Sequence, residues 1–246
     1  MGTSKAFSGI SGNPNWSDLS RIVTSSCDDG QISKEKLSRI TSRFVTLLDG
    51  SKIGGRGGSK IGGRAGIRTA RRIGNVLSDV KNVGFYQAVA NSGYNINSDT
   101  TPNEVINYLL EYCSGVASSL DDTAAKEAER QLLEEIATDA KTLADLEKNF
   151  TEKVQEFGVE ELLIKYYAYY IYEHLSIDFY EKLIKEKGKS KCGNLYNQLK
   201  DFLFERVKNI SQKKDLSRIN WAGEEGDRMV KNIFEDTLKA FEGYED

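Results

Sequence analysis

The chain has little of what a disulfide framework, a zinc site or a histidine-based catalytic centre requires. Its 246 residues include three cysteines, two prolines and one histidine. The cysteines, Cys27, Cys113 and Cys192, lie far apart and form no C-x-x-C pair, so we expect three reduced thiols. No motif for a metal or a cofactor is present either, and we expect neither to be bound.

Long hydrophobic runs are also missing. No stretch approaches the ~18 apolar residues that a membrane-spanning helix needs, and the first residues contain no apolar core of a secretory signal. The start does not fit the myristoylation pattern, because Ala6 stands where serine or threonine is required. We therefore predict a cytoplasmic protein that does not interact with a membrane.

Charge is present in both signs but is unevenly distributed along the chain. The net charge is -3, yet residues 1–81 contain 14 lysines and arginines against 6 acidic residues, a net charge of +8. The remainder has a net charge of -11. Such asymmetry predicts either an acidic partner for the basic part or two parts that fold against each other.

Apolar residues recur at helical spacing along most of the chain, and no convincing alternating strand pattern is present. Residues 101–104, Thr-Pro-Asn-Glu, form a capping box with proline at the first helical position. Ser33 and Asp121 are expected to cap further helices, and Gly158 is expected to break one. The predicted fold is all-α and bundle-like.

Composition divides the chain into three predicted parts. Residues 1–15 form a flexible N-terminal tail of small and polar residues. Residues 16–95 form a basic helical region that contains a glycine-rich loop at 50–66, and residues 96–246 form an acidic helical domain.

The glycine-rich loop contains a repeat. The unit GSKIGGR begins at Gly50 and again at Gly58, and eight of the seventeen residues from Gly50 to Gly66 are glycine, which disfavours both helix and strand. Lys60 follows a serine and precedes an isoleucine, so a P-loop does not fit, and the same lysine replaces the third glycine of a dinucleotide fingerprint. We do not expect a nucleotide loop here.

Two functions remain for the basic repeat. Its charge could neutralise nucleic-acid phosphates, but no aromatic residue for base stacking lies between Phe44 and Phe85. Docking on the acidic part of the chain or on a partner protein is favoured, because Ile53 and Ile61 recur in register and offer apolar anchors. A nucleic-acid-binding helical module is the alternative.

The only histidine and the tyrosine-rich segment predict packing rather than catalysis. His174 has Leu163, Tyr167, Tyr170 and Ile171 at helical spacing, which is typical of a core face. No H-E-x-x-H zinc pattern includes it. The tyrosines surround their helix, which favours a core helix over an interface helix; they are Tyr166, Tyr167, Tyr169, Tyr170 and Tyr172. We expect no enzyme activity.

Three segments together resemble a known family. They are the start MGTS with its Ser/Gly-rich tail, the segment GGRGGSKIGGRAGIRTARRIG, and the aromatic GFYQAV, which cover about the first third of the chain. They resemble the QatB family, the helical component of the four-gene Qat antiphage defence systems of bacteria. The tail is shorter and poorer in proline than the family pattern.

The resemblance implies a non-catalytic subunit with several partners. A QueC-like enzyme of the QatC type would bind the N-terminal tail and process it, conjugate a deazaguanine-type base to it, or both. A KAP-type ATPase and a TatD-like nuclease would complete the system. Carried over to this sequence, the modified or processed residue is Gly2, and the tail contacts are Met1, Thr3, Ser4 and Lys5.

With this resemblance, the repeat is best interpreted as a strap or docking loop for a partner. Basic residues would meet an acidic or phosphate-bearing surface, and the two isoleucines would anchor the strap. The predicted contacts are Lys52, Ile53, Arg56, Lys60, Ile61, Arg64, Arg68, Arg71 and Arg72.

Overall fold

The computed structural model describes residues 14–48, 63–208, 210–212 and 214–242, and every regular element in them is a helix. This confirms the all-α prediction. The elements are α1 Pro14–Ser26, α2 Lys34–Leu47, α3 Arg64–Val83, α4 Phe85–Asn91, α5 Pro102–Cys113, α6 Leu120–Ile136, α7 Leu143–Lys187, α8 Lys189–Val207 and α9 Glu224–Glu242.

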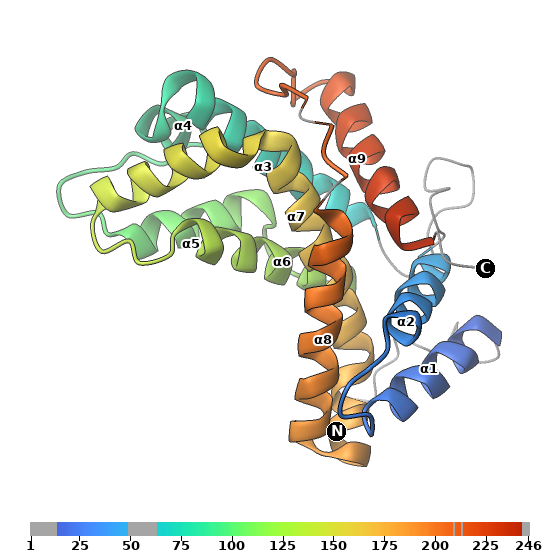
Figure 1. Ribbon diagram of the computed structural model, residues 1–246. Coiled ribbons are helices and arrows are strands. Elements are labelled where there is room, and N and C mark those ends of the chain that lie inside the picture. Colours follow the sequence, from blue (N-terminus) through green and yellow to red (C-terminus); the bar gives the residue numbers. More distant parts are fainter. Residues whose placement is uncertain (1–13, 49–62, 209, 213, 243–246) are drawn as a thin grey trace.

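Helix α7 is the central element and consists of two helices that meet at Gly158. This residue has φ 72° and ψ 166°, outside the helical region, and a positive φ is easily adopted by glycine. The predicted break is therefore confirmed as a kink. The first part of α7 lies beside α4, and the second part descends alongside α8 (Figure 1).

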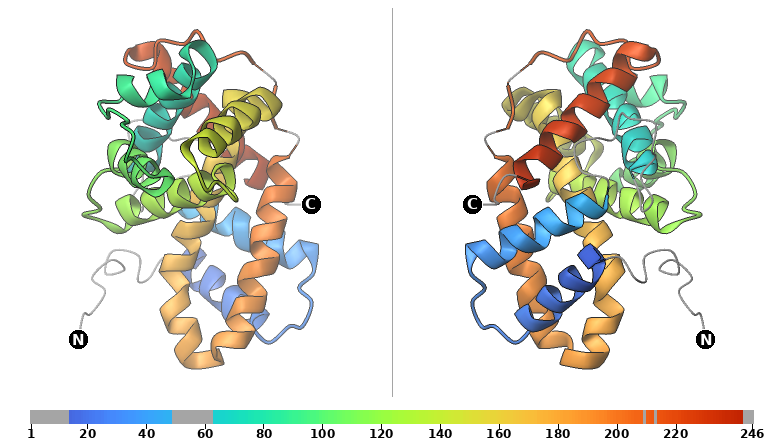
Figure 2. Two further views of the ribbon diagram at one scale, coloured as in Figure 1. Left: turned by 90° about the vertical axis from the view of Figure 1, so that its left-hand side faces the viewer. Right: turned by 90° about the vertical axis from the view of Figure 1, so that its right-hand side faces the viewer.

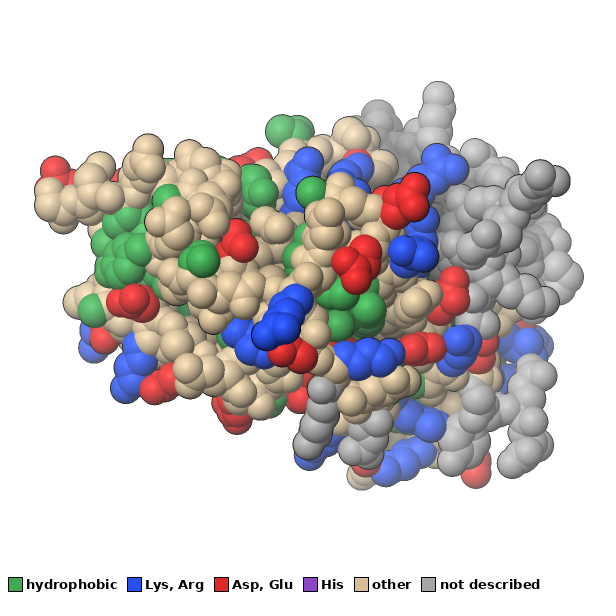
Figure 3. Space-filling model, turned by 90° about the horizontal axis from the view of Figure 1, so that it is seen from above, with side chains coloured by type: hydrophobic (Ala, Val, Ile, Leu, Met, Phe, Trp, Pro, Cys, Tyr) green, Lys and Arg blue, Asp and Glu red, His purple; other side chains and the backbone are tan. Residues whose placement is uncertain are grey.

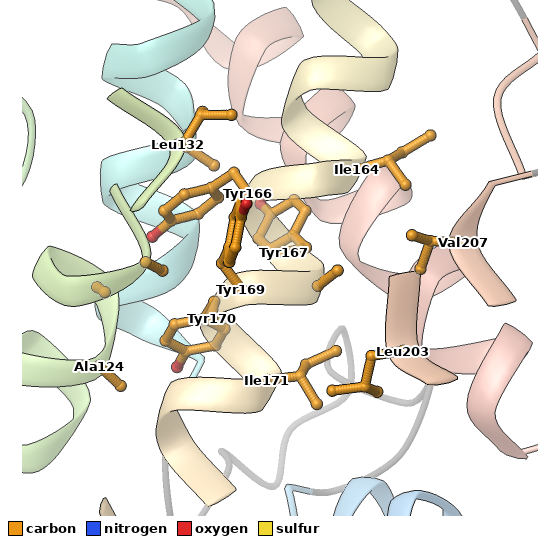
Figure 4. Packing of buried hydrophobic residues seen from close by; sticks show 14 of the residues in the cluster. Ala124, Leu132, Ile164, Tyr166, Tyr167, Tyr169, Tyr170, Ile171, Leu203 and Val207 are labelled. Atoms are coloured by element: carbon orange, nitrogen blue, oxygen red, sulfur yellow. The ribbon is translucent and has the colours of Figure 1, made fainter. Parts of the chain in front are cut away.

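The second part of α7 is buried on several sides. Tyr166 and Tyr170 point towards Leu132 and Ala124 of α6 on one side, while Ile171 on another side approaches α8 (Figure 4). Tyr166, Tyr167 and Tyr170 are fully buried. The tyrosine-rich segment is thus a core helix, as its sequence predicts.

Helices α1 and α2 cross the lower part of the α7–α8 pair (Figure 2). The ring of Trp16 stacks on Phe179 of α7, with 4.8 Å between the ring centroids. The Ile32 amide donates a hydrogen bond of 2.9 Å to the Gln198 side chain on α8. Buried residues from 16–95 and from 96–246 belong to one cluster, so the two predicted regions share a core; their boundary stays a prediction.

The helix caps confirm two predictions and correct one. Ser33 accepts a hydrogen bond from the Lys36 amide at the start of α2, and Thr101 forms the predicted capping box with Glu104. Asp121 does not cap α6, because Ser119 accepts the Asp122 amide and occupies that position. Asp121 is the second residue of α6, and its carboxylate is left available to other groups.

None of the helices in the described part of the chain is long and apolar enough to cross a membrane.

Candidate partner-binding site at the start of helix α3

The site lies where the glycine-rich repeat ends and α3 begins. Gly63 is the N-cap residue, with φ 108°, and has no side chain with which to satisfy the first helical amides. The Asp121 carboxylate accepts hydrogen bonds from the Gly63 amide at 3.2 Å and from the Ala65 amide at 3.0 Å. Asp121 therefore caps a helix that begins more than fifty residues earlier in the sequence.

Two buried side chains of α7 complete this anchor. The Tyr170 hydroxyl accepts a hydrogen bond of 2.7 Å from the Gly63 amide and donates one to Asp121. His174 is 1% exposed, and its Nε2 lies 3.5 Å from a carboxylate oxygen of Asp121. His174 thus packs beside the anchor, which agrees with its predicted place on a core face.

The Asp121 carboxylate stays ionised despite its burial. Burial by itself would raise its pKa, but hydrogen bonds from His174, Tyr170 and the Ala65 amide outweigh burial and lower the pKa below its ordinary value. A negative charge at this place also complements the positive end of the α3 dipole. The charge of Asp121 and its hydrogen bonds therefore both stabilise the first turn of α3.

Gly66 allows the ring of Tyr170 to lie directly against α3. A Cβ atom at this position would come within 2.9 Å of the ring, a separation too short for any side chain. The last glycine of segment 50–66 thus has a packing role, and Tyr170 reaches Gly63 because position 66 has no side chain.

Three of the four arginines on α3 bind groups of the acidic half of the chain. Arg68 pairs with Asp122 and Arg71 with Asp227, both at 2.8 Å. Arg72 donates to the carbonyl oxygens of Tyr112 and Cys113 at the end of α5. These contacts join the two parts of opposite charge, which is one of the two outcomes that the charge asymmetry predicts.

The fourth arginine differs from these three. Arg64 is exposed and has no hydrogen bond or ion pair with any described residue. The bound arginines retain further N–H donors, since each guanidinium has five. Partner contact stays a prediction for all four arginines.

The other predicted contacts lie outside the described residues. These are Met1, Gly2, Thr3, Ser4 and Lys5 of the tail and Lys52, Ile53, Arg56, Lys60 and Ile61 of the repeat. The two residues that flank segment 49–62 are both buried, because Leu48 is 0% exposed and Gly63 is also buried. The chain thus enters and leaves this segment at fixed positions.

A second buried acid, Glu129 on α6, was not found from the sequence. It is 0% exposed and hydrogen-bonds to the Ser114 hydroxyl. Burial raises its pKa to about 8, although hydrogen bonds from Ser114 and the Cys113 thiol act in the opposite direction. The carboxyl group is therefore mostly neutral at pH 7. Nothing in the sequence signals this, because Glu129 stands among other charged residues of α6, next to Glu127 and Arg130.

The described residues contain no group of three or more histidine, cysteine or carboxylate side chains that could hold a metal ion.

Comparison with known proteins gives one match. A family model described as "Qat anti-phage system associated protein QatB" matches residues 54–241, about three quarters of the chain. The match begins inside the glycine-rich repeat and ends within α9, and it does not include the N-terminal tail. No curated protein and no solved structure matches the chain.

Proposed function

The chain belongs to the QatB family, a component of Qat anti-phage defence systems, and on this premise we propose that it is a non-catalytic subunit whose N-terminal tail is the substrate of a partner enzyme. The enzyme is of the QueC-like, QatC type, and Gly2 is the residue that it processes or modifies. A residue without a side chain in an extended tail fits a narrow active site.

The anchor at the start of α3 is the observation that supports a docking role for the repeat. Asp121 and Tyr170 hold Gly63 by hydrogen bonds, and Leu48 is buried at the other end of the segment. Residues 49–62 connect these two positions. In this proposal they form a strap that presents Ile53, Ile61 and the basic residues to a partner.

Mass spectrometry tests the tail proposal directly. The intact protein and its N-terminal peptide are measured after expression alone and after expression with the QueC-like partner. We expect a mass change at or beside Gly2 only when an active partner is present. If an active partner leaves the N-terminal peptide unchanged apart from loss of Met1, the tail is not a substrate.

Two variants of the tail make this test specific. Gly2→Val adds a branched side chain at the proposed reaction site and should strongly reduce the mass change. Ser4→Ala is the matched control, because it changes a neighbouring tail residue and leaves Gly2 intact. Equal modification of both variants would show that Gly2 is not the site.

The strap is tested separately by affinity capture of the partner. Ile53→Ser combined with Ile61→Ser should weaken capture, because both proposed apolar anchors are removed. Ser51→Ala combined with Ser59→Ala changes the same two repeat units and should leave capture unchanged. Unchanged capture by the isoleucine variant would exclude these anchors without affecting the tail proposal.

Nucleic-acid binding through the Gly/Arg segment is the alternative function and has less support. Arg68 and Arg71 are already paired with carboxylates of the same chain. On the face shown in Figure 3, lysine and arginine side chains lie among aspartate and glutamate side chains. A steep decrease of oligonucleotide affinity with salt, measured on the protein alone, would favour this alternative.

A further inference from the structure

A second basic cluster lies between α1 and α2. Arg21 contacts Asp18 at 2.7 Å, and Arg39 contacts both carboxylate oxygens of Asp18 at 3.3 and 3.4 Å. The Nε of Arg43 lies 3.4 Å from the same carboxylate. Three guanidinium groups from two helices thus converge on one acidic side chain.

The number of arginines per carboxylate is higher here than at other ion pairs of the chain. Arg68 and Arg71 each have one carboxylate partner, and Arg130 has two, Glu127 and Glu134. Around Asp18, the two positive charges of Arg21 and Arg39 already exceed the single negative charge of the carboxylate by one. Their side chains are 77% and 58% exposed, so most of their N–H donors face solvent.

The distances indicate what kind of anion would fit beside Asp18. A carboxylate has two oxygens, and that of Asp18 makes a short contact only with Arg21. A phosphate group has more oxygens and up to two negative charges, so it can accept from several guanidinium groups at once. Guanidinium forks match phosphate geometry and bind it by charge-assisted hydrogen bonds.

A shallow hollow adjoins the cluster on the other side of Arg21. Its volume is about 650 Å³, which is in the range of small-molecule sites. Trp16, Arg21 and the hydroxyl side chains of α1 line it together with Asp28 and with Glu186 and Lys187 of α7. The hollow therefore places an aromatic ring and hydroxyl groups beside Arg21, whereas its lysine, Lys187, is already paired with Asp28.

We propose that Arg21, Arg39 and Arg43, oriented by Asp18, form a receptor for the phosphate groups of a small molecule. The ligand is a nucleotide or a free polyphosphate, and the hollow beside Arg21 takes the part of the ligand that extends beyond the bound phosphate. This site involves neither Asp121 nor the arginines of α3, so its test is separate from the tests of the proposed function.

A nucleic-acid strand fits this surface less well than a small molecule does. A strand requires a continuous positive track, whereas exposed Glu35 lies near Lys36 on α2 and Lys36 is itself bound to Asp29. The excess positive charge is confined to the arginines around Asp18. We therefore expect recognition of one compact anionic group.

The test is a calorimetric titration of the full chain with sodium tripolyphosphate and, separately, with ATP at constant ionic strength. The variants are Arg21→Glu and Arg39→Glu, whose side chains are exposed. Lys231→Glu on α9 is the matched control, because it makes the same change in net charge at an exposed position outside the arginine cluster. Circular dichroism confirms that each variant is folded.

We expect the wild type and Lys231→Glu to bind, and both arginine variants to bind at least about tenfold more weakly. Equal affinity for the two ligands would mean that the site recognises phosphate alone, and tighter binding of ATP would place the nucleoside in the hollow. Absence of binding by the wild type, or unchanged binding by Arg39→Glu, would overturn the proposal. A parallel titration with a long single-stranded oligonucleotide would overturn it as well if the oligonucleotide bound and neither small ligand did.

Discussion

At the scale of single residues, Asp121 shows how one carboxylate organises two helices. It lies in the first turn of α6, yet its oxygens accept the first amides of α3. The sequence identifies it as a capping residue, because aspartate before a helical pattern is typical of an N-cap. Only the packing of α6 against α3 decides which helix receives the cap.

Replacing Asp121 by asparagine tests this role. Asparagine keeps one acceptor oxygen, but it loses the charge and directs an NH₂ group towards groups that donate. We expect the free energy of unfolding to fall by about 1 to 3 kcal/mol in urea titrations. Glu152→Gln is the control, because Glu152 is an exposed acid in a 3.9 Å ion pair. It should change the free energy of unfolding by less than about 0.5 kcal/mol. A similar small change for both variants would contradict the capping role.

Glu129 gives a prediction about how the stability of the folded protein depends on pH. Its pKa is about 8 in the folded chain against a reference value of 4.5, so the folded state holds a proton that the unfolded state releases between these values. Unfolding in this interval releases a proton and becomes easier as pH rises. We expect this residue to reduce stability by about 3 kcal/mol between pH 5 and pH 8.

Glu129→Gln isolates that contribution, since glutamine keeps the size and carries no titrating group. Urea unfolding of the wild type and the variant is compared at pH 5, 6.5 and 8. The variant should gain stability relative to the wild type as pH rises. Parallel pH profiles for the two proteins would mean that Glu129 is not protonated in the folded state.

At the scale of elements, α3 is shaped by contacts on several sides. The sequence places Arg64, Arg68 and Arg72 on one face because they recur every four residues. In the structure Arg68 reaches α6 and Arg72 reaches α5, because neighbouring helices surround α3. Periodicity predicts that the helix exists and which side is apolar, but it does not reveal which neighbour each long side chain meets.

Other elements were predictable because their signals are local. The kink at Gly158 and the capping box at Thr101 follow from residue types at fixed positions. The ring of Trp221 against Gly74 does not, because these two residues lie far apart in the sequence. A Cβ atom at Gly74 would lie 2.5 Å from that ring.

We therefore expect Gly74→Ala to destabilise the protein, although replacing glycine by alanine usually stabilises a helix. Alanine favours a helix interior over glycine by about 1 kcal/mol, but here it would displace Trp221. We expect a net loss of about 1 to 3 kcal/mol. Gly193→Ala in α8 is the matched control, because no atom lies within 4 Å of its added Cβ, and it should increase the thermal midpoint. If both variants became more stable, the packing of Trp221 on α3 would be excluded.

At the scale of the whole molecule, the basic and acidic parts form one body. Ion pairs such as Arg71 with Asp227 and Lys81 with Asp215 cross between them, and the buried residues form one cluster. Exposed pairs contribute little individually, so the shared core is the stronger link. We expect both parts to unfold together.

The fluorescence of the two tryptophans tests whether both parts unfold together. Trp16 lies on α1, and Trp221 is buried against α3. A Trp16→Phe variant reports on Trp221 alone, and a Trp221→Phe variant reports on Trp16 alone. Within each variant, the thermal midpoint from fluorescence should equal that from circular dichroism. Different midpoints within one variant would indicate that the predicted regions 16–95 and 96–246 unfold separately.

The contacts of α1 and α2 also set the order of events during synthesis. The Ile32 amide binds Gln198, 166 positions later, and Asp28 binds Lys191. At about 5 to 20 residues per second, the ribosome needs roughly ten to thirty seconds to make these later partners. During this interval the first two helices have left the ribosome and their docking surface on α7 and α8 does not yet exist. In the function proposed above, an enzyme that acts on Gly2 would therefore meet a nascent chain, and modification of the tail would precede folding of the subunit.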